Sequence, residues 1–287
     1  SILGHVEQTE AHGIVRSGGL SPGLASLRET AVFLANKVEM PGKKCRDGTK
    51  YTVIAIFLHD PFLDADEPAQ LVNALIEPFK KENIYPFHVF HGLDAARSFM
   101  ARMEHEARSA TDRYHLSGEE LTRWLTGRAP AAGAPILSLL CASAIAAAQP
   151  GGAVHEVLSC LMSESLAAQH ERRMHLIGLG LGSLIAQELA RPDQPDMLPV
   201  ASLALVDPIG AVTSASATLA QTTQVQASIA SLQGFRGSWT SLARSTIADR
   251  APPAKAQHRL HAATLTDAAF NGTLASTILT SLNRFHR

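Results

Sequence analysis

The residues of this chain best suited to chemistry are three glycines, Gly178, Gly180 and Gly182, which separate an apolar run from a helical pattern. Glycines at such a point allow positive φ angles and let a helix approach a sheet closely. Three kinds of site use a turn of this shape: a dinucleotide site, a site for S-adenosylmethionine, and the sharp turn that raises a nucleophilic serine above a sheet.

The spacing of the glycines and their place in the chain separate these alternatives. A dinucleotide site needs G-x-G-x-x-G, but Ser183 stands at the position of the third glycine. An S-adenosylmethionine site could use Asp207, which ends the next apolar run, to hold the ribose. Nucleotide folds normally place the glycine turn after the first strand, whereas here only one clear strand follows the turn. The position therefore favours the nucleophile turn.

The segment HLIGLGLGSLIAQELA resembles the nucleophile elbow of the α/β-hydrolase superfamily, where H-L-x-G-H-S-x-G-x-x-I-A-x-x-L is common. FLHDPF stands where that family has its oxyanion loop, and NALIEPFKKENIYPFHVFH resembles the helix and strand that follow the loop in bacterial members. The resemblance covers residues 51–91 and 174–207 and, less closely, 256–285. It implies that Asp207 is the acid of a catalytic triad and that His261 is its histidine, with His258 as an alternate.

Two departures from the family pattern concern the chemistry itself. Gly180 stands where the nucleophilic serine belongs, and glycine has no side chain that can attack a carbonyl. Leu179 replaces the usual polar neighbour, and Asp60 replaces a glycine of the oxyanion loop, where a carboxylate would repel a developing oxyanion. We treat these losses as independent, and they predict a protein without serine-hydrolase chemistry. The corresponding ligand or oxyanion region comprises His59, Asp60, Leu179, Gly180 and Leu181.

Other polar residues near the turn have two interpretations each. Ser183 is a candidate substitute nucleophile, although a serine in a helix's first turn more often satisfies a free backbone N–H. His59 and Asp60 could act as a base and its partner, or only as a cap and turn at a strand end. Asp207 is either the acid of a site or an acid that caps the turn at Pro208.

The histidines and cysteines form no familiar metal motif. His88 and His91 are three residues apart, which places them on opposite faces of a predicted strand. His170, Glu171 and His175 give H-E-x-x-x-H, one residue longer than the zinc-binding motif. The three cysteines are too scattered for a disulfide framework or a zinc site. We therefore expect no metal and no cofactor, and a reducing, cytoplasmic environment.

Hydrophobic patterns predict a three-layer α/β fold, like that of the hydrolases, with a mainly parallel sheet and helical insertions. Continuous apolar runs are typical of parallel strands that are covered on both faces. The predicted strands are 51–58, 85–91, 174–177 and 200–206. The predicted helices are 22–38, 68–81, 153–169, 183–190 and 267–285.

The remaining segments set the predicted domain organisation. Residues 1–50 should form an N-terminal arm and helix, with 1–20 irregular because they show no sustained periodicity. Residues 51–287 should form one domain, with a helical insertion at about 92–170 and a low-charge cover at about 208–250. Residues 208–235 carry no charge, and their apolar residues recur at helical intervals, which favours a helical cover over a flexible linker.

Composition excludes some functions and leaves others open. With 25 Lys and Arg against 26 Asp and Glu, the chain lacks the basic excess that nucleic-acid binding requires. The start of the sequence does not resemble a secretory signal. The apolar centre of 129–155 is too short to span a bilayer. Because 129–155 and 208–235 are uncharged, we expect them to form an apolar pocket or an interface with a partner or a second copy.

These observations predict a hydrolase-like protein that binds an apolar or acyl-type ligand, or a protein partner, without efficient turnover. Two alternatives stay open. One is a methyltransferase that binds S-adenosylmethionine at Gly178 to Gly182. The other is a hydrolase in which Asp207 and His261 activate water directly. Thirteen histidines also predict that net charge depends on pH near 6.

Overall fold

The computed structural model describes most of the chain up to residue 206 and the backbone of two later strands. The described residues are 2, 4–15, 20, 22–35, 51, 53–62, 67–116, 120, 123–124, 138–167, 173–191, 198–206, 222–229, 257–262, 276 and 279. For 222–229 and 257–262 we describe the backbone alone.

The centre of the fold is an eight-stranded sheet with the order β2-β1-β4-β3-β5-β6-β7-β8. The strands are β1 (Val6–Glu10), β2 (Gly13–Ile14), β3 (Val53–Leu58), β4 (Ile84–His91), β5 (Arg173–Leu179), β6 (Val200–Val206), β7 (Thr222–Ile229) and β8 (Gln257–Ala262). Only the β1–β2 pair is antiparallel among these strands. Since β4 lies on one side of β3 and β5 on the other, the strand order reverses between β3 and β5.

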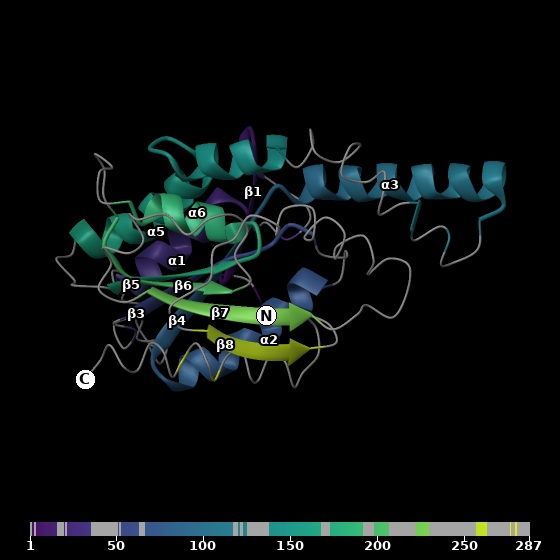
Figure 1. Cartoon of the computed structure of the whole chain (residues 1–287). Helices are drawn as coiled ribbons and strands as arrows, with labels where there is room; N and C mark the ends of the chain where they lie inside the picture. The colour runs from purple at the N-terminus through teal and green to yellow at the C-terminus, as the bar shows by residue number, and fades with distance from the viewer. Residues whose placement is uncertain are drawn as a thin grey trace.

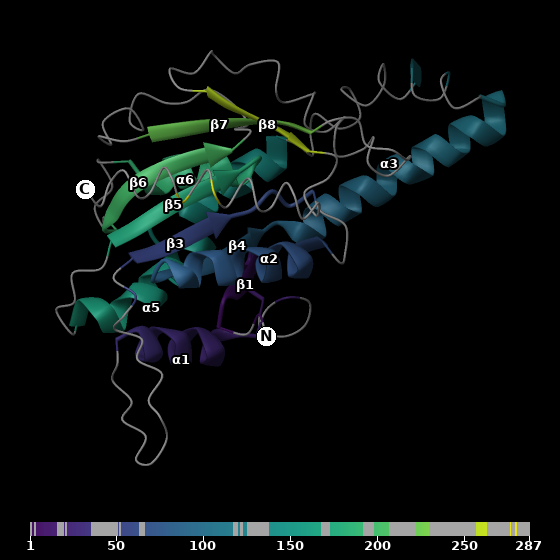
Figure 2. The same ribbon diagram turned by 90° about the horizontal axis from the view of Figure 1, so that it is seen from below.

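Helices cover both faces of the sheet (Figure 1). The helices are α1 (Leu24–Leu34), α2 (Glu67–Lys81), α3 (Leu93–Tyr114), α5 (Ala153–Ala167) and α6 (Gly182–Leu189), together with helical residues 138–148. One face is covered by α1, α5 and α6, while α2 packs on the other face against β4. Figure 2 shows that α3 extends beyond the sheet, past its carboxyl edge.

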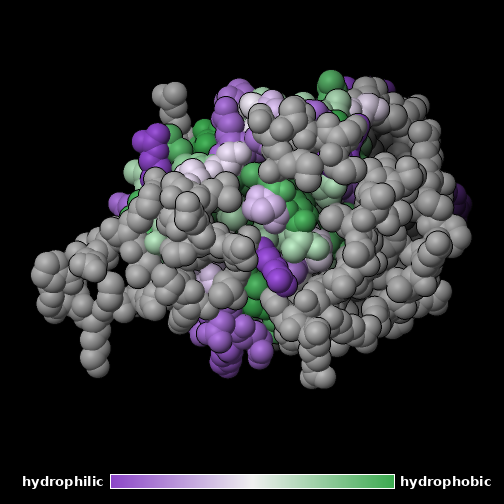
Figure 3. Space-filling model, turned by 90° about the vertical axis from the view of Figure 1, so that its left-hand side faces the viewer, coloured by the Kyte–Doolittle hydropathy of each residue, from purple (hydrophilic) through white to green (hydrophobic). Residues whose placement is uncertain are grey.

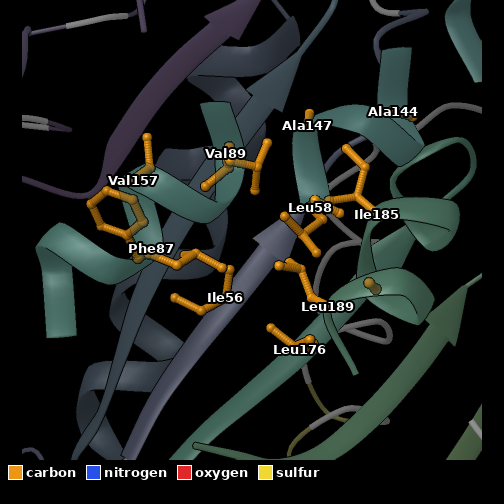
Figure 4. Close-up of a cluster of buried hydrophobic side chains, with 14 of the residues drawn as sticks. Ile56, Leu58, Phe87, Val89, Ala144, Ala147, Val157, Leu176, Ile185 and Leu189 are labelled. Atoms are coloured by element: carbon orange, nitrogen blue, oxygen red, sulfur yellow. The ribbon is translucent and has the colours of Figure 1, made fainter. Parts of the chain in front are cut away.

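The larger core lies between the sheet and the α1, α5 and α6 layer (Figure 4). Its strand residues include Ile56, Leu58, Phe87, Val89 and Leu176, and the helices contribute Ala144, Ala147, Val157, Ile185 and Leu189. All of these side chains are buried. Because side chains alternate across a strand, the residues between them face α2.

On the α2 side, aromatic rings and a smaller apolar cluster fill the core. Phe57 meets Phe79 of α2 edge to face, with 5.1 Å between ring centroids. Val6, Val72, Ile76, Phe90 and Leu93 form the apolar cluster. The surface at the amino ends of the strands is mixed in polarity where the structure describes it (Figure 3).

The patterns of the central strands and their helices are confirmed. The predicted strands correspond to β3, β4, β5 and β6, and four predicted helices correspond to α1, α2, α5 and α6. The described residues between 92 and 170 are mainly helical: α3, 138–148 and α5. The predicted helix 267–285 lies outside the described residues apart from positions 276 and 279. In the described part of the chain, no helix combines the length and apolarity needed to cross a membrane.

The prediction of an irregular arm at residues 1–20 is wrong for residues 6–10 and 13–14, which form β1 and β2. Residues 6–10 form β1, which runs parallel to β4 and pairs Val6 with His88 and Thr9 with His91. The sequence of β1, VEQTE, is mostly polar, yet all five residues are buried. A hydrophobic pattern cannot reveal such a strand, because its polar side chains are buried against partners from elsewhere in the chain.

The prediction of a helical cover over 208–235 is wrong for residues 222–229. These residues form β7, parallel to β6, and β7 pairs in turn with β8. Apolar residues spaced by three or four positions indicated a helix, but the β-branched residues Thr222, Thr223, Val225 and Ile229 favour a strand. Pairing with the neighbouring strand β6 stabilises β7, and the spacing of apolar residues within 208–235 does not reveal that pairing.

Candidate functional site

The three glycines lie at the carboxyl end of β5, where the strand turns directly into α6. Gly180 has φ 54°, in the left-handed region, and the N–H of Ser183 donates to its carbonyl oxygen at 3.1 Å. The turn lies beside the end of β3, since Leu58 pairs with Gly178. It therefore occupies the point where the strand order reverses, the usual ligand site of open parallel sheets.

Close packing explains two of the glycines. A Cβ at Gly182 would lie 2.0 Å from the carbonyl oxygen of Leu58, and a Cβ at Gly178 would lie 2.6 Å from the Cα of Ser183. Neither space can hold a carbon atom. These glycines allow the first turn of α6 to lie directly against the backbone of β3 and β5.

At Gly180 it is a side chain, rather than the backbone, that leaves no room for a Cβ. A Cβ at this position would lie 2.3 Å from Oδ2 of Asp60, so the carboxyl group fills the space that a side chain would use. Asp60 is 2% exposed, and its Oδ1 accepts a hydrogen bond from the N–H of Phe62 at 3.2 Å. The sequence suggested that the residues at positions 60 and 180 depart from the hydrolase pattern independently, and the structure shows that they do not. They meet at one point and fit each other.

This arrangement limits what the turn can do. A serine at position 180 would collide with Asp60, and the carboxyl group blocks the approach of a substrate to the Cα of Gly180. The carboxyl oxygens there also leave no room for a phosphate or a developing oxyanion beside Gly180. The turn joins β5 directly to α6 with Gly180 at a positive φ, but the space above it is occupied.

His59 lies in the core rather than at the mouth of the turn. Its Nε2 lies 2.8 Å from Nδ1 of His88, and its ring stacks on Phe90 with 4.2 Å between centroids. Burial lowers the pKa of His59 to about 3. Burial and the neighbouring His59 and His5 lower the pKa of His88 well below its ordinary value. Both rings are therefore neutral near pH 7.

The other predicted residues of the turn are also buried. Leu179 is 4% exposed and Leu181 is 2% exposed, and Leu181 belongs to the larger core. Ser183 is fully buried in the first turn of α6. The N-cap of this helix is Leu181, without a hydrogen bond from its side chain. The structure thus brings together Asp60 and Gly180, and buries the predicted residues around them.

The predicted triad partners are described only in part. Asp207 lies outside the described residues, as does His170. The backbone of His261 lies within β8, where it pairs with Ser228, and His258 lies in the same strand. His88 and His91 do lie on opposite faces of β4, since His88 contacts His59 on the α2 side and His91 contacts Ser143 on the other. Among the described residues, no cluster of three potential ligands could hold a metal ion.

A cavity of about 760 Å³ lies at the carboxyl ends of β1 and β4, away from the glycine turn. Its lining is largely small and apolar, with leucines, alanines and glycines from 139–153 on one side. The polar and charged residues in the lining are Glu10, His12, His91, Ser143 and Glu156. Residues 139–153 of the uncharged segment therefore do line a cavity, although the sequence did not single out Glu10, His91 or Ser143 as its polar groups.

Hydrogen bonds fix the polar groups of the cavity. His91 Nδ1 lies 3.0 Å from Oγ1 of Thr9, and His91 Nε2 lies 2.9 Å from Oγ of Ser143. Burial lowers the pKa of His91 to about 4, against the opposing effect of Ser143. Oε1 of Glu10 accepts a hydrogen bond from the N–H of Asp94 at 3.1 Å, and burial raises the pKa of Glu10.

Comparisons of the chain with family models, with curated proteins and with solved structures found no match. The class that the fold and the site define is a mainly parallel α/β protein with a glycine turn at the point where its strand order reverses.

Proposed function

We propose that this chain is an α/β-hydrolase-like protein whose elbow supplies no nucleophile, and that it binds a small apolar ligand in the cavity beside β1 and β4. The observation that carries the first half is the Asp60 carboxyl group in the space of a side chain at Gly180. With Asp60 in this place, position 180 has neither a nucleophilic side chain nor the space for one.

The position and backbone of the glycine turn support the proposed likeness to the hydrolases. The glycine turn follows a central strand, it comes after several earlier strands of the chain, and Gly180 has a positive φ where the family has its serine. The alternative of a methyltransferase fits less well, because that reading needs the glycine turn early in the sheet and open to a cofactor.

The lining of the cavity indicates the class of ligand. Its volume of about 760 Å³ is in the range of small-molecule sites, and most of the lining is apolar. The acidic residues Glu10 and Glu156 line it, and among the described lining residues there is no lysine or arginine. A free carboxylate would be repelled, so an uncharged ester, alcohol or amine fits better than a fatty acid.

Binding of the neutral fluorophore N-phenyl-1-naphthylamine tests the cavity. We expect a saturable rise in emission with the full chain, and loss of that rise in Ala146→Trp, which places a large ring in the cavity. Ala101→Trp on the exposed surface of α3 is the matched control and should bind like the original chain. Equal binding by both variants, or none by the original chain, would contradict the assigned ligand site. A protein partner on the same face would then be the remaining alternative.

The elbow is tested with a fluorophosphonate probe, which reacts with activated serines. Peptide mapping should find no label between residues 174 and 190. Label on Ser183 that disappears in Ser183→Ala would show an active elbow and overturn the proposal.

A further inference from the structure

The cavity contains a serine and a histidine in contact, outside the elbow. Ser143 is half-buried and lines the cavity, and its Oγ lies 2.9 Å from Nε2 of His91. When Nδ1 of His91 carries the proton and donates it to Thr9, Nε2 is free to accept the hydroxyl proton of Ser143. A nucleophile, a base and a residue that orients the base are therefore in line.

Strand pairing holds the orienting residue in place. Thr9 and His91 are direct partners in the β1–β4 pair, and the N–H of Gly92 donates to the carbonyl oxygen of Thr9 at 3.0 Å. Thr9 is fully buried and His91 is 3% exposed. The imidazole is thus fixed by the sheet, while Ser143 comes from the helical residues that form the opposite wall.

Two other serine–histidine contacts lack this setting. Ser159 Oγ lies 3.4 Å from Nδ1 of His155, and Ser202 Oγ lies 2.5 Å from Nδ1 of His175. Ser202 and His175 are buried within the sheet, and neither Ser159 nor Ser202 lines the cavity. Of these contacts, only that of Ser143 and His91 borders this cavity.

We propose that Ser143 is a nucleophilic serine, with His91 as its base and Thr9 as a positioning residue, that reacts with small uncharged esters. This inference rests on the cavity as the ligand site of the proposed function. Oγ of Ser143 attacks the carbonyl carbon and its proton passes to Nε2 of His91. The bond to the leaving alcohol then breaks, and the alcohol takes that proton. Water hydrolyses the acyl-serine, with His91 accepting the proton of water and returning it to Ser143.

The state of His91 predicts an unusual pH profile. The titratable groups around it are Glu10 from β1, His12 from the β1–β2 turn, Asp94 from α3 and Glu156 from α5. Since burial lowers the pKa of His91 to about 4, its ring is neutral throughout the range from pH 5.5 to 8. The rate of serine labelling should therefore stay level from pH 8 to 5.5, instead of falling near 6.5 as it does with an ordinary histidine base.

An uncharged alkyl fluorophosphonate, applied to the full chain and followed by mass spectrometry, tests the assignment. We expect label on Ser143, and a labelling rate at least tenfold lower in Ser143→Ala. Ser159→Ala, a serine beside a histidine outside the cavity, is the matched control and should label at the original rate. Thr9→Val should slow labelling and Thr9→Ser should restore it, because serine keeps the hydroxyl that orients His91.

Each outcome separates this inference from the proposed function. If Ser143 stays unlabelled while N-phenyl-1-naphthylamine still binds, the nucleophile is disproved and the ligand site stands. If the fluorophore does not bind and Ser143 is unlabelled, both fail. A level pH profile supports His91 as the base, whereas a fall centred near pH 6.5 overturns its role.

Discussion

At the scale of single residues, the contact between Asp60 and Gly180 decides which side chains the glycine turn can hold. A serine at position 180 requires an empty space above the turn, and a carboxyl group at position 60 requires that position 180 has no side chain. Asp60 is therefore compatible with the fold only while position 180 is glycine. Gly180→Ser alone should therefore not create a reactive serine at this turn.

A double-mutant cycle measures this dependence. Gly180→Ala should lower the free energy of unfolding by roughly 2–4 kcal/mol, because it combines a positive φ with a collision at Asp60. In the background of Asp60→Gly the same substitution should cost only about 1–2 kcal/mol, since only the backbone strain is left. Chemical denaturation of the four proteins gives both values. Equal costs in the two backgrounds would mean that Asp60 does not occupy this space in solution.

At the scale of elements, the strand β1 shows how far local patterns can predict this fold. Strands β3 to β6 were predicted because they are apolar on both faces, which is visible in the sequence alone. β1 is polar, and its burial depends on partners such as His91 for Thr9 and the N–H of Asp94 for Glu10. Those partners are more than 80 positions away in the chain, so no local window contains them.

The place of β1 in the core gives a stability prediction. Val6→Ala should lower the free energy of unfolding by roughly 1.5–2.5 kcal/mol, because Val6 is 1% exposed and packs with Val72, Ile76 and Phe90. His12→Ala, in the exposed turn between β1 and β2, should change it by less than about 0.5 kcal/mol. Urea denaturation of both variants checks the difference. An effect of Val6→Ala as small as that of His12→Ala would indicate an arm outside the core.

At the scale of the whole molecule, burial changes the pKa of four of the histidines. Composition alone predicts that all thirteen take up protons near pH 6. In the structure, burial lowers the pKa of His5 and His91 to about 4 and that of His59 to about 3, and His88 shifts in the same direction. These four rings remain neutral in the folded protein, so they affect its stability more than its charge.

The sign of that effect follows from the lowered pKa values. Unfolded histidines take up protons below about pH 6.5 while the folded rings do not, so protons favour the unfolded state. Each buried ring should reduce the free energy of unfolding by about 1 kcal/mol between pH 7 and pH 5.5. His59→Phe/His88→Phe should remove about half of this loss. Denaturation at both pH values tests it, with the exposed His105→Gln as the control, and an unchanged loss in the double variant would rule out these two rings as its source.

The sequence by itself determined the mainly parallel sheet and the glycine turn, because each depends on residue types within a short window. Only the tertiary structure decided that Asp60 fills the space at Gly180, and that His91 meets Ser143, which is 52 positions away, and Thr9, which is 82 positions away. The strand order brings these segments together at the carboxyl edge of the sheet. Contacts of this kind depend on how side chains from distant segments pack in the core, and the spacing of residues within one segment does not predict that packing.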